Sequence, residues 1–194
     1  MSVAGLNGTL APDEVEQALA PRATEFGRCF TPHMRRLRTL GGRILLAFHV
    51  GRDGHVMRVY GSDSTVGHRE VERCVMGVAA ETQFPAPHGG EADFSWPLEL
   101  DPPNGVRLPI TWDPSRVAGV VRRRAHRVLE ECGHGGFQVT TYVSRRGRVL
   151  AAGAAVRDAA SLEHIDCVIA QVRRWRMPRP DAHQAKVTFD LTAN

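Results

Sequence analysis

The sequence has 194 residues, of which 42% are hydrophobic and 24% charged, and its formal net charge is +4. This composition is ordinary for a soluble globular protein, and the length suits one large domain or two small ones. No apolar run approaches the roughly 20 residues that span a bilayer, and residues 1–10 lack the basic start and apolar core of a signal peptide.

The charge is distributed unevenly along the chain. Residues 1–100 contain 10 Arg and Lys against 12 Asp and Glu, whereas residues 101–194 contain 15 against 9. The second half is therefore basic and could bind an anionic surface.

The first predicted element is a helix over residues 13–30. Apolar residues recur there at helical spacing, and Pro12 with Asp13 provides a start signal. The residues on this face are Val15, Ala18, Leu19, Arg22, Phe26 and Cys29.

Two strands joined by a tight turn follow this helix. Residues 44–50 alternate between apolar and other side chains, which is typical of a strand with one buried face. Residues 51–54 predict a hairpin turn, because glycine accepts the positive φ that such turns require, and residues 56–60 predict the second strand.

A second helix is predicted over residues 69–82, and Pro85 marks its end because proline disfavours helix in the residue before it. A last alternating strand follows, with Phe94, Trp96 and Leu98 on one face. The sequence therefore predicts an α+β module in the order helix, strand, strand, helix, strand. Its three-stranded antiparallel sheet carries two helices on one face.

The second half of the chain repeats this order. An offset of 93 positions brings Gly54, Cys74 and Pro85 onto identical residues, and an offset of 103 does the same for Cys29. The second copy has lost ten residues between that cysteine and the next strand. Its predicted elements are helices over 115–132 and 162–175, strands over 137–143, 149–156 and 187–191, and a turn at 145–147.

We therefore predict two tandem modules. The first covers residues 1–100 and the second, divergent one covers residues 112–194, with a linker over 101–111 that contains three prolines and little to pack.

Each module has two cysteines, Cys29 with Cys74 and Cys132 with Cys167, all expected on the buried faces of the helices. Small modules gain support from disulfides, so we predict one bridge in each, with buried free thiols as the alternative. Bridges imply an oxidising compartment, the bacterial periplasm or the cell exterior. An export signal is then expected in a part of the protein that precedes this sequence.

A zinc site is a competing interpretation of the second cysteine pair. Cys132, His134, His164 and Cys167 would supply a Cys2His2 ligand set. The first copy has no histidines at the corresponding spacings, so we favour disulfides and predict neither a metal nor another cofactor.

A series of short motifs runs through residues 8–100. They are Cys29-Phe30, Gly42-Arg43-Ile44, Asp53-Gly54-His55-Val56, Val71-Glu72-Arg73-Cys74, residues 84–90 (Phe-Pro-Ala-Pro-His-Gly-Gly) and Trp96-Pro97-Leu98. Together they resemble the TonB C-terminal-like domain of myxobacterial envelope proteins, including those of the adventurous gliding motility machinery. The second copy keeps Gly147, Val149, Cys167 and Pro178 but lacks the Pro-x-x-Gly-Gly run.

The resemblance implies a periplasmic module at the end of a longer protein anchored in the inner membrane, outside this sequence. Such a module would link a motility or energised transport machine to outer-membrane or cell-wall partners. It also implies that an envelope protein binds by strand addition at the final strand.

The residue pattern of the last strands also indicates where strand addition is expected. An edge strand offers unpaired N–H and C=O groups, but Pro97 blunts the edge in the first copy. We therefore predict that the partner binds the final strand of the second copy, and that proline at Val187 or Thr188 weakens binding. The predicted edge consists of Lys186, Val187, Thr188, Phe189 and Asp190.

Two other functions compete with that of a protein-binding module. The nine histidines are scattered, and no HExxH, CxxC or strand-to-helix glycine-rich loop is present, so we predict no enzyme. The alternative function is binding of an anionic polymer, peptidoglycan or nucleic acid, through the second copy. We favour a solvated helix face with Trp175 in the core over nucleic acid. The predicted basic patch consists of Arg122, Arg123, Arg124, Arg173, Arg174 and Arg176.

Overall fold

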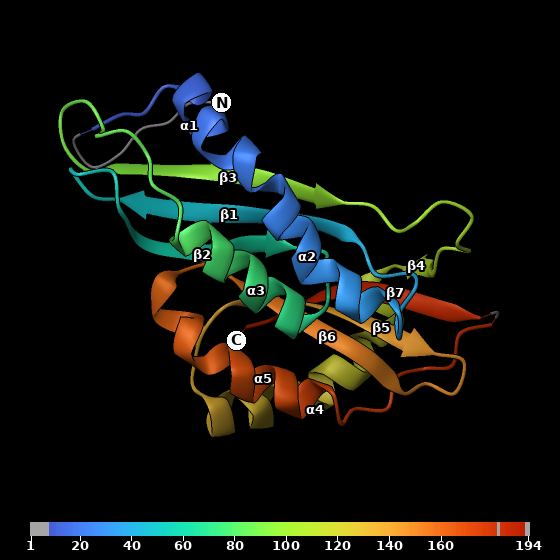
Figure 1. The fold of residues 1–194 in the computed structure, drawn as a ribbon. Coiled ribbons are helices and arrows are strands. Elements are labelled where there is room, and N and C mark those ends of the chain that lie inside the picture. Colours follow the sequence, from blue (N-terminus) through green and yellow to red (C-terminus); the bar gives the residue numbers. More distant parts are fainter. Residues whose placement is uncertain (1–7, 182, 193–194) are drawn as a thin grey trace.

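The computed structural model describes residues 8–181 and 183–192 (Figure 1). It is an α+β fold with a three-stranded antiparallel sheet in order β2-β1-β3 and a four-stranded mixed sheet in order β4-β7-β5-β6. We call residues 8–100 module 1 and residues 110–192 module 2. None of the helices in these described ranges has the length and apolar character of a membrane-spanning segment.

Module 1 packs its helices on one face of the β2-β1-β3 sheet (Figure 1). Its strands pair antiparallel along their whole length, from Gly42 opposite Leu100 to Val50 opposite Ala92 in the β1–β3 pair. The elements are α1 (Pro12–Leu19), η1 (Ala20–Arg22), α2 (Ala23–Met34), β1 (Gly42–Val50), β2 (Val56–Ser64), α3 (Arg69–Ala80) and β3 (Ala92–Leu100).

The first helix is interrupted, which corrects the prediction of one continuous helix over 13–30. A single 3-10 turn, η1, separates α1 from α2 at Pro21. Proline has no N–H to continue the helical hydrogen bonds, and its ring clashes with the carbonyl of the preceding turn. Val15, Leu19 and Phe26 are nevertheless buried, so the predicted apolar face still covers the sheet.

Module 2 repeats this order but begins with an additional strand. The elements are β4 (Ile110–Trp112), η2 (Pro114–Val117), α4 (Ala118–Cys132), β5 (Phe137–Ser144), β6 (Val149–Val156), η3 (Ala159–His164), α5 (Ile165–Val172) and β7 (Gln184–Leu191).

Strand β4 corrects two predictions. The end of the predicted linker is a strand, and the sheet of module 2 has four strands of mixed direction because β4 pairs parallel with β7, from Ile110 opposite Ala185 to Trp112 opposite Val187. The physical reason is Trp112, which is only 7% exposed in the core of module 2 and draws this part of the chain alongside β7.

The hairpin turn is built in the same way in both modules. Gly54 and Gly147 have φ values of 82° and 74°, which favour glycine. Their carbonyls accept hydrogen bonds from Phe84 N–H at 3.0 Å and Met177 N–H at 2.9 Å, respectively. A Cβ on Gly54 would collide with the carbonyl oxygen of Phe84, and a Cβ on Gly147 would collide with that of Met177. Only glycine therefore allows the segment after the second helix to pack this closely on the turn.

The two modules pack against each other and share a buried boundary (Figure 1). Helices α4 and α5 cover one face of the module 2 sheet, on the side of Val139 and Val143. On its opposite face, Tyr142 and Ala151 belong to the hydrophobic core of module 1. The part of the module 2 sheet formed by β5 and β6 is therefore largely buried on both faces.

Candidate functional site

Both predicted disulfides are present. Cys29–Cys74 joins α2 to α3 with a Cα–Cα distance of 5.6 Å, and Cys132–Cys167 joins α4 to α5 at 5.5 Å. The bridges indicate an oxidising, extracytoplasmic location. Because they bond both cysteines of the alternative zinc set to each other, that set has no thiolate to offer.

The cysteines are not all buried, which corrects part of the expectation. Cys29 and Cys132 are 3% and 7% exposed, but Cys74 and Cys167 lie at exposed positions. Helix α3 buries Val71, Val75 and Ala79, so position 74 falls at the border of that stripe. Each bridge therefore runs from the core to the surface of its module.

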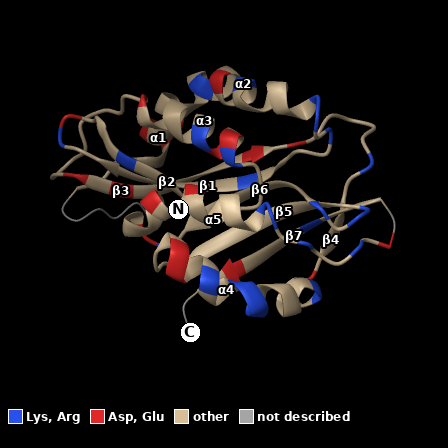
Figure 2. Ribbon diagram, turned by 90° about the horizontal axis from the view of Figure 1, so that it is seen from below, with Lys and Arg blue, Asp and Glu red and all other residues tan. Residues whose placement is uncertain are grey.

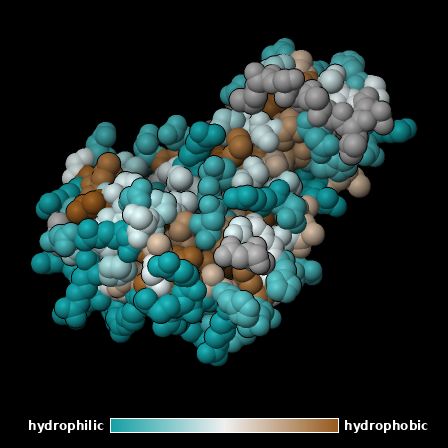
Figure 3. Space-filling view, turned by 180° about the vertical axis from the view of Figure 1, so that it is seen from behind, coloured by the Kyte–Doolittle hydropathy of each residue, from teal (hydrophilic) through white to brown (hydrophobic). Residues whose placement is uncertain are grey.

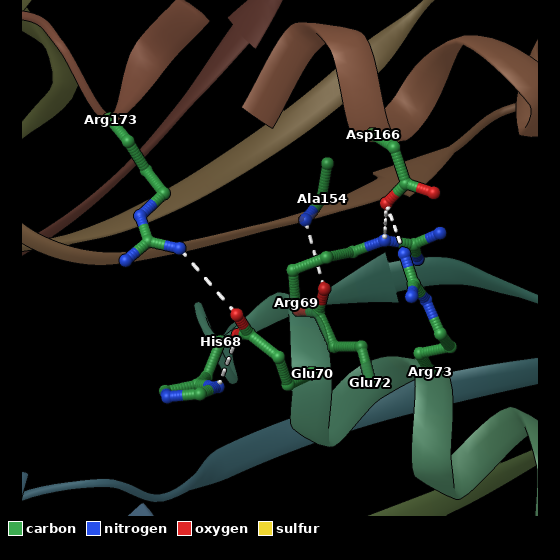
Figure 4. A network of polar contacts seen from close by, with 8 residues as sticks. All are labelled: His68, Arg69, Glu70, Glu72, Arg73, Ala154, Asp166 and Arg173. Carbon is green, nitrogen blue, oxygen red and sulfur yellow. Dashed lines mark hydrogen bonds and ion pairs between the residues drawn. The ribbon is translucent and has the colours of Figure 1, made fainter. Parts of the chain in front are cut away.

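A buried carboxylate lies between the modules. Glu72 of α3 is 1% exposed, and its carboxylate accepts a hydrogen bond from Ser64 Oγ at 2.8 Å. It accepts a second one from Ala154 N–H of β6 at 3.0 Å (Figure 4). Because β6 is the edge strand of its sheet, Glu72 satisfies a donor that no neighbouring strand can reach. Burial raises the pKa of Glu72, and the hydrogen bonds from Ser64 and Ala154 oppose this rise.

Ion pairs surround this carboxylate on the surface between α3 and α5 (Figure 4). Asp166 accepts from Arg69 Nε at 2.7 Å and from Arg73 Nη2 at 2.8 Å, and Arg173 Nη1 lies 3.5 Å from Glu70. The hydrogen bond from Arg69 lowers the pKa of Asp166.

The modules meet through equivalent elements. Strand β2 lies against β6, its counterpart in the repeat. Arg73 forms an ion pair with Asp166. These two residues occupy equivalent positions of the repeat, because they are 93 positions apart, as are Cys74 and Cys167. The interface is not symmetric, because α3 of module 1 packs on β6, whereas α5 of module 2 makes no comparable contact with β2.

A second contact region involves the segment between α2 and β1. Tyr142 of β5 donates its hydroxyl to the Gly41 carbonyl at 3.0 Å, and Lys186 Nζ of β7 donates to the same oxygen at 2.7 Å. Thr39 Oγ1 hydrogen-bonds Gln184 Oε1 at 2.9 Å. Burial lowers the pKa of Lys186 to about 8 and raises that of Tyr142. Lys186, predicted to bind a partner, is thus part of the interface between the modules.

Among the described residues, the predicted edge strand lacks a second neighbouring strand over only part of its length. Strand β4 pairs with Ala185, Lys186 and Val187, which corrects the assignment of β7 as a complete edge, while Thr188–Leu191 extend beyond this pairing. A proline at Val187 would therefore disturb β4 of the chain itself. Phe189 is buried in the core and Asp190 is exposed.

An open groove borders the free part of β7. It has a volume of about 540 Å³ and lies between α4 and the end of β7. Apolar side chains of α4 line it together with polar and charged side chains. The lining residues are Ala118, Val121, Arg122, Ala125, His126, Leu129, Glu130, His134, Asp190 and Thr192.

Module 1 has a groove in the equivalent place. It measures about 370 Å³ and lies between α1 and β3, the edge strand of the module 1 sheet. Val15 of α1 and Trp96 of β3 contribute apolar surface, and Trp96 Nε1 donates to Glu16 Oε2 at 3.3 Å. Pro97 lies within β3 and lines this groove.

The predicted basic patch is divided among several places. Arg123, Arg124 and Arg174 line a depression between α4 and α5, but Arg122 lies on the groove beside β7. Arg173 pairs with Glu70 of module 1, and Arg176 lies with other arginines near the β5–β6 turn. Figure 2 shows basic residues in blue on α4 and in the loops at the β4 and β7 end of the module 2 sheet. Trp175 is 3% exposed and belongs to the core.

No family model, curated protein or solved structure matches this chain. The resemblance to the TonB C-terminal-like domain therefore rests on the sequence motifs, which are more complete in module 1 than in module 2.

Sequence reasoning did not find the interface between the modules. Glu72 stands in a helical segment among charged residues and reads as a surface side chain. One signal was available in β6, where residues 151–156 are all buried and consist of Ala, Gly and Val. A strand without polar alternation is typical of a sheet that is covered on both faces.

Proposed function

We propose that this protein is a non-catalytic interaction module of the periplasm that binds an extended segment of an envelope protein at an open sheet edge. The observation that carries the proposal is the recurrence of one arrangement in both modules. In each, an apolar groove against the first helix borders the free edge of the last strand.

This arrangement suits strand addition. A strand edge offers backbone hydrogen bonds in any sequence, whereas a neighbouring groove accepts every second side chain of the added segment and provides specificity. The groove of module 2 has the apolar Ala118, Val121, Ala125 and Leu129 along α4. Strand β4 is an example of addition to this edge within the chain, and Thr188–Leu191 leave room for a partner beyond it.

The setting of the proposed partner follows from the disulfides and the family resemblance. Two bridges favour the periplasm, and the resemblance favours a motility or energised transport machine. In such a machine the module would link an inner-membrane-anchored component to outer-membrane or cell-wall partners.

The proposal is tested by photo-crosslinking in an envelope extract. A photoreactive residue at Thr192, beside the module 2 groove, or at Ser95, beside the module 1 groove, should capture a discrete envelope protein. The control position is Met57, which is 68% exposed on β2 and lines neither groove.

The captured partner then allows a quantitative test. Ala125→Gln places a larger side chain in the module 2 groove and should weaken binding about tenfold or more, because the groove loses the space for an apolar side chain. Arg124→Gln is the matched control, because it changes the adjacent residue of α4, which lines the depression on the other side of the helix. Equal affinities of the two variants, or crosslinks from Met57 alone, would refute the proposal.

A further inference from the structure

The β5–β6 turn and the segment after α5 form a strongly basic surface at one end of module 2. Arg145, Arg146, Arg176 and Arg179 line one open depression together with Met177. Arg148 joins them, because it forms a β-bridge with Arg176. Five guanidinium groups thus come from two segments that the Gly147 turn holds together.

These arginines are not neutralised by the protein. None of the ion pairs formed within residues 8–181 and 183–192 involves Arg145, Arg146, Arg148, Arg176 or Arg179. Asp181, the acidic residue that follows them in the chain, binds Arg116 at 2.6 Å instead. The surface therefore presents five positive charges to solvent.

Module 1 shows that the fold does not require this charge. It builds the same turn against the same segment, with Phe84 N–H donating to Gly54 as Met177 N–H donates to Gly147. At the five equivalent positions it has Arg52, Asp53, His55, Gln83 and Ala86, whose charges sum to zero with His55 neutral. The arginines of module 2 are thus an addition to a scaffold that folds without them.

Exposed aliphatic side chains lie at the same end of the sheet. Leu108 and Ile110 are 58% and 39% exposed, although they are large and apolar. Ile110 pairs with Ala185, next to Gln184, and Gln184 pairs with Ser144 at the start of the basic turn. His183 Nε2 forms a hydrogen bond with the Leu108 carbonyl oxygen at 2.7 Å. Figure 3 shows hydrophobic surface at this end, on the left of the view, beside hydrophilic surface.

We propose that this end of module 2 docks on the surface of an anionic phospholipid membrane. The arginines bind the phosphate headgroups, and Leu108 and Ile110 enter the interfacial region between headgroups and acyl chains. The combination of unpaired cations with exposed aliphatic side chains suits a lipid surface, since a membrane provides an apolar phase beneath its headgroups that aliphatic side chains can enter. Nucleic acid is the poorer fit, because the depression has no aromatic lining residue on which a base can stack.

The test measures binding of the purified chain to phosphatidylcholine vesicles with and without phosphatidylglycerol. We expect binding only when phosphatidylglycerol is present. In the triple variant Arg146→Asp, Arg176→Gln and Arg179→Ala, each arginine is replaced by the residue at the equivalent position of module 1. The variant therefore has four fewer units of positive charge. Each arginine near an anionic surface strengthens binding roughly fivefold, so the variant should bind on the order of a hundredfold more weakly or worse.

Two further variants make the result specific. Arg122→Gln with Arg123→Gln and Arg124→Gln removes three charges from α4, away from the docking surface, and should change vesicle binding less than about fivefold. Leu108→Ser with Ile110→Ser should weaken vesicle binding severalfold but leave binding to soluble inorganic polyphosphate unchanged.

Several outcomes would overturn the proposal. No binding to phosphatidylglycerol vesicles would do so, as would an equal loss in the α4 variant. If polyphosphate binds as tightly as the vesicles and the serine variant behaves like wild type toward both, the surface binds an anionic polymer and not a membrane. The proposal does not depend on the edge grooves, so the crosslinking experiment and the vesicle experiment can fail separately.

Discussion

The two modules share an element order, but their sheets are buried differently. In β1 of module 1 a buried residue alternates with a more exposed one, whereas the last six residues of β6 in module 2 are all buried. Strand β2, the counterpart of β6, contains Arg58 and Asp63, while β6 has only Val, Leu, Ala and Gly. The two copies therefore differ where module 2 packs on module 1, and the absence of polar alternation in β6 is what burial on both faces requires.

The ten residues that distinguish the first copy have a related role. The segment between α2 and β1 supplies Thr39 and Gly41, which bind Gln184, Tyr142 and Lys186 of module 2. This segment is a platform for the second module. Among the described residues, no other module packs on the equivalent segment of module 2. The ten additional residues would therefore make no such contact there.

The first way to test the comparison is to remove each disulfide separately. Replacing Cys29 and Cys74, or Cys132 and Cys167, by serine opens loops with sequence separations of 45 and 35. Because the entropy of loop closure depends weakly on length, each pair of substitutions should cost about 4 kcal/mol. Urea unfolding of the two variants measures this. A cost well below 1 kcal/mol in either module would show that its bridge adds nothing to the stability of that module.

The second test concerns Glu72 at the interface. Glu72→Ala leaves Ala154 N–H and Ser64 Oγ without their acceptor, and each unsatisfied buried group costs roughly 1–3 kcal/mol. Glu72→Gln keeps an acceptor oxygen and removes the titration. The isostere should therefore be far more stable than the alanine variant in thermal unfolding, and equal stability would show that the hydrogen bonds are unimportant.

The same pair of proteins has a defined pH dependence. Burial raises the pKa of Glu72 from its ordinary value of 4.5, so the folded protein holds a proton that the unfolded chain releases. Stability from this group is therefore complete below pH 4.5 and is lost as the pH rises through the raised pKa. Wild type should lose stability relative to Glu72→Gln over this rise. A constant difference between the two proteins from pH 4 to pH 8 would contradict the assignment.

Much of each module could be predicted from its own residues, but the relation between modules could not. Alternation and helical spacing are local, and they give the strands, the helices and the disulfide pairs. Strand β4 is only three residues long in a proline-rich segment, and it forms because Trp112 is buried by residues far away in sequence. Glu72 is likewise an interface residue only because β6 packs beside it. The formation of β4 and the burial of Glu72 depend on tertiary contacts, which local sequence patterns do not predict.

A third test uses the two tyrosines of the chain. Tyr142 is fully buried, and its hydroxyl bonds Gly41 of the other module, so Tyr142→Phe should cost about 1 kcal/mol. Tyr60 is only partly buried, and its hydroxyl forms no hydrogen bond within the described residues, which makes Tyr60→Phe the control, with an expected change near zero. Chemical denaturation measures both. Similar values for the two variants would mean that the contact with the α2–β1 segment does not hold the modules together.

The smallest expected effect separates the two arginines that share Asp166. The side chain of Arg69 is 12% exposed and that of Arg73 is 63% exposed, although both bind the same carboxylate oxygen at 2.7 and 2.8 Å. Solvent screens an exposed pair, so double-mutant cycles with alanine should give a coupling of about 1 kcal/mol for Arg69–Asp166 and a few tenths for Arg73–Asp166. Added salt should reduce the second coupling more than the first, because the Arg73 pair is the more accessible to ions. If the order of the couplings is reversed, position 73, where the two repeats meet through equivalent residues, contributes more to the interface than its exposure predicts.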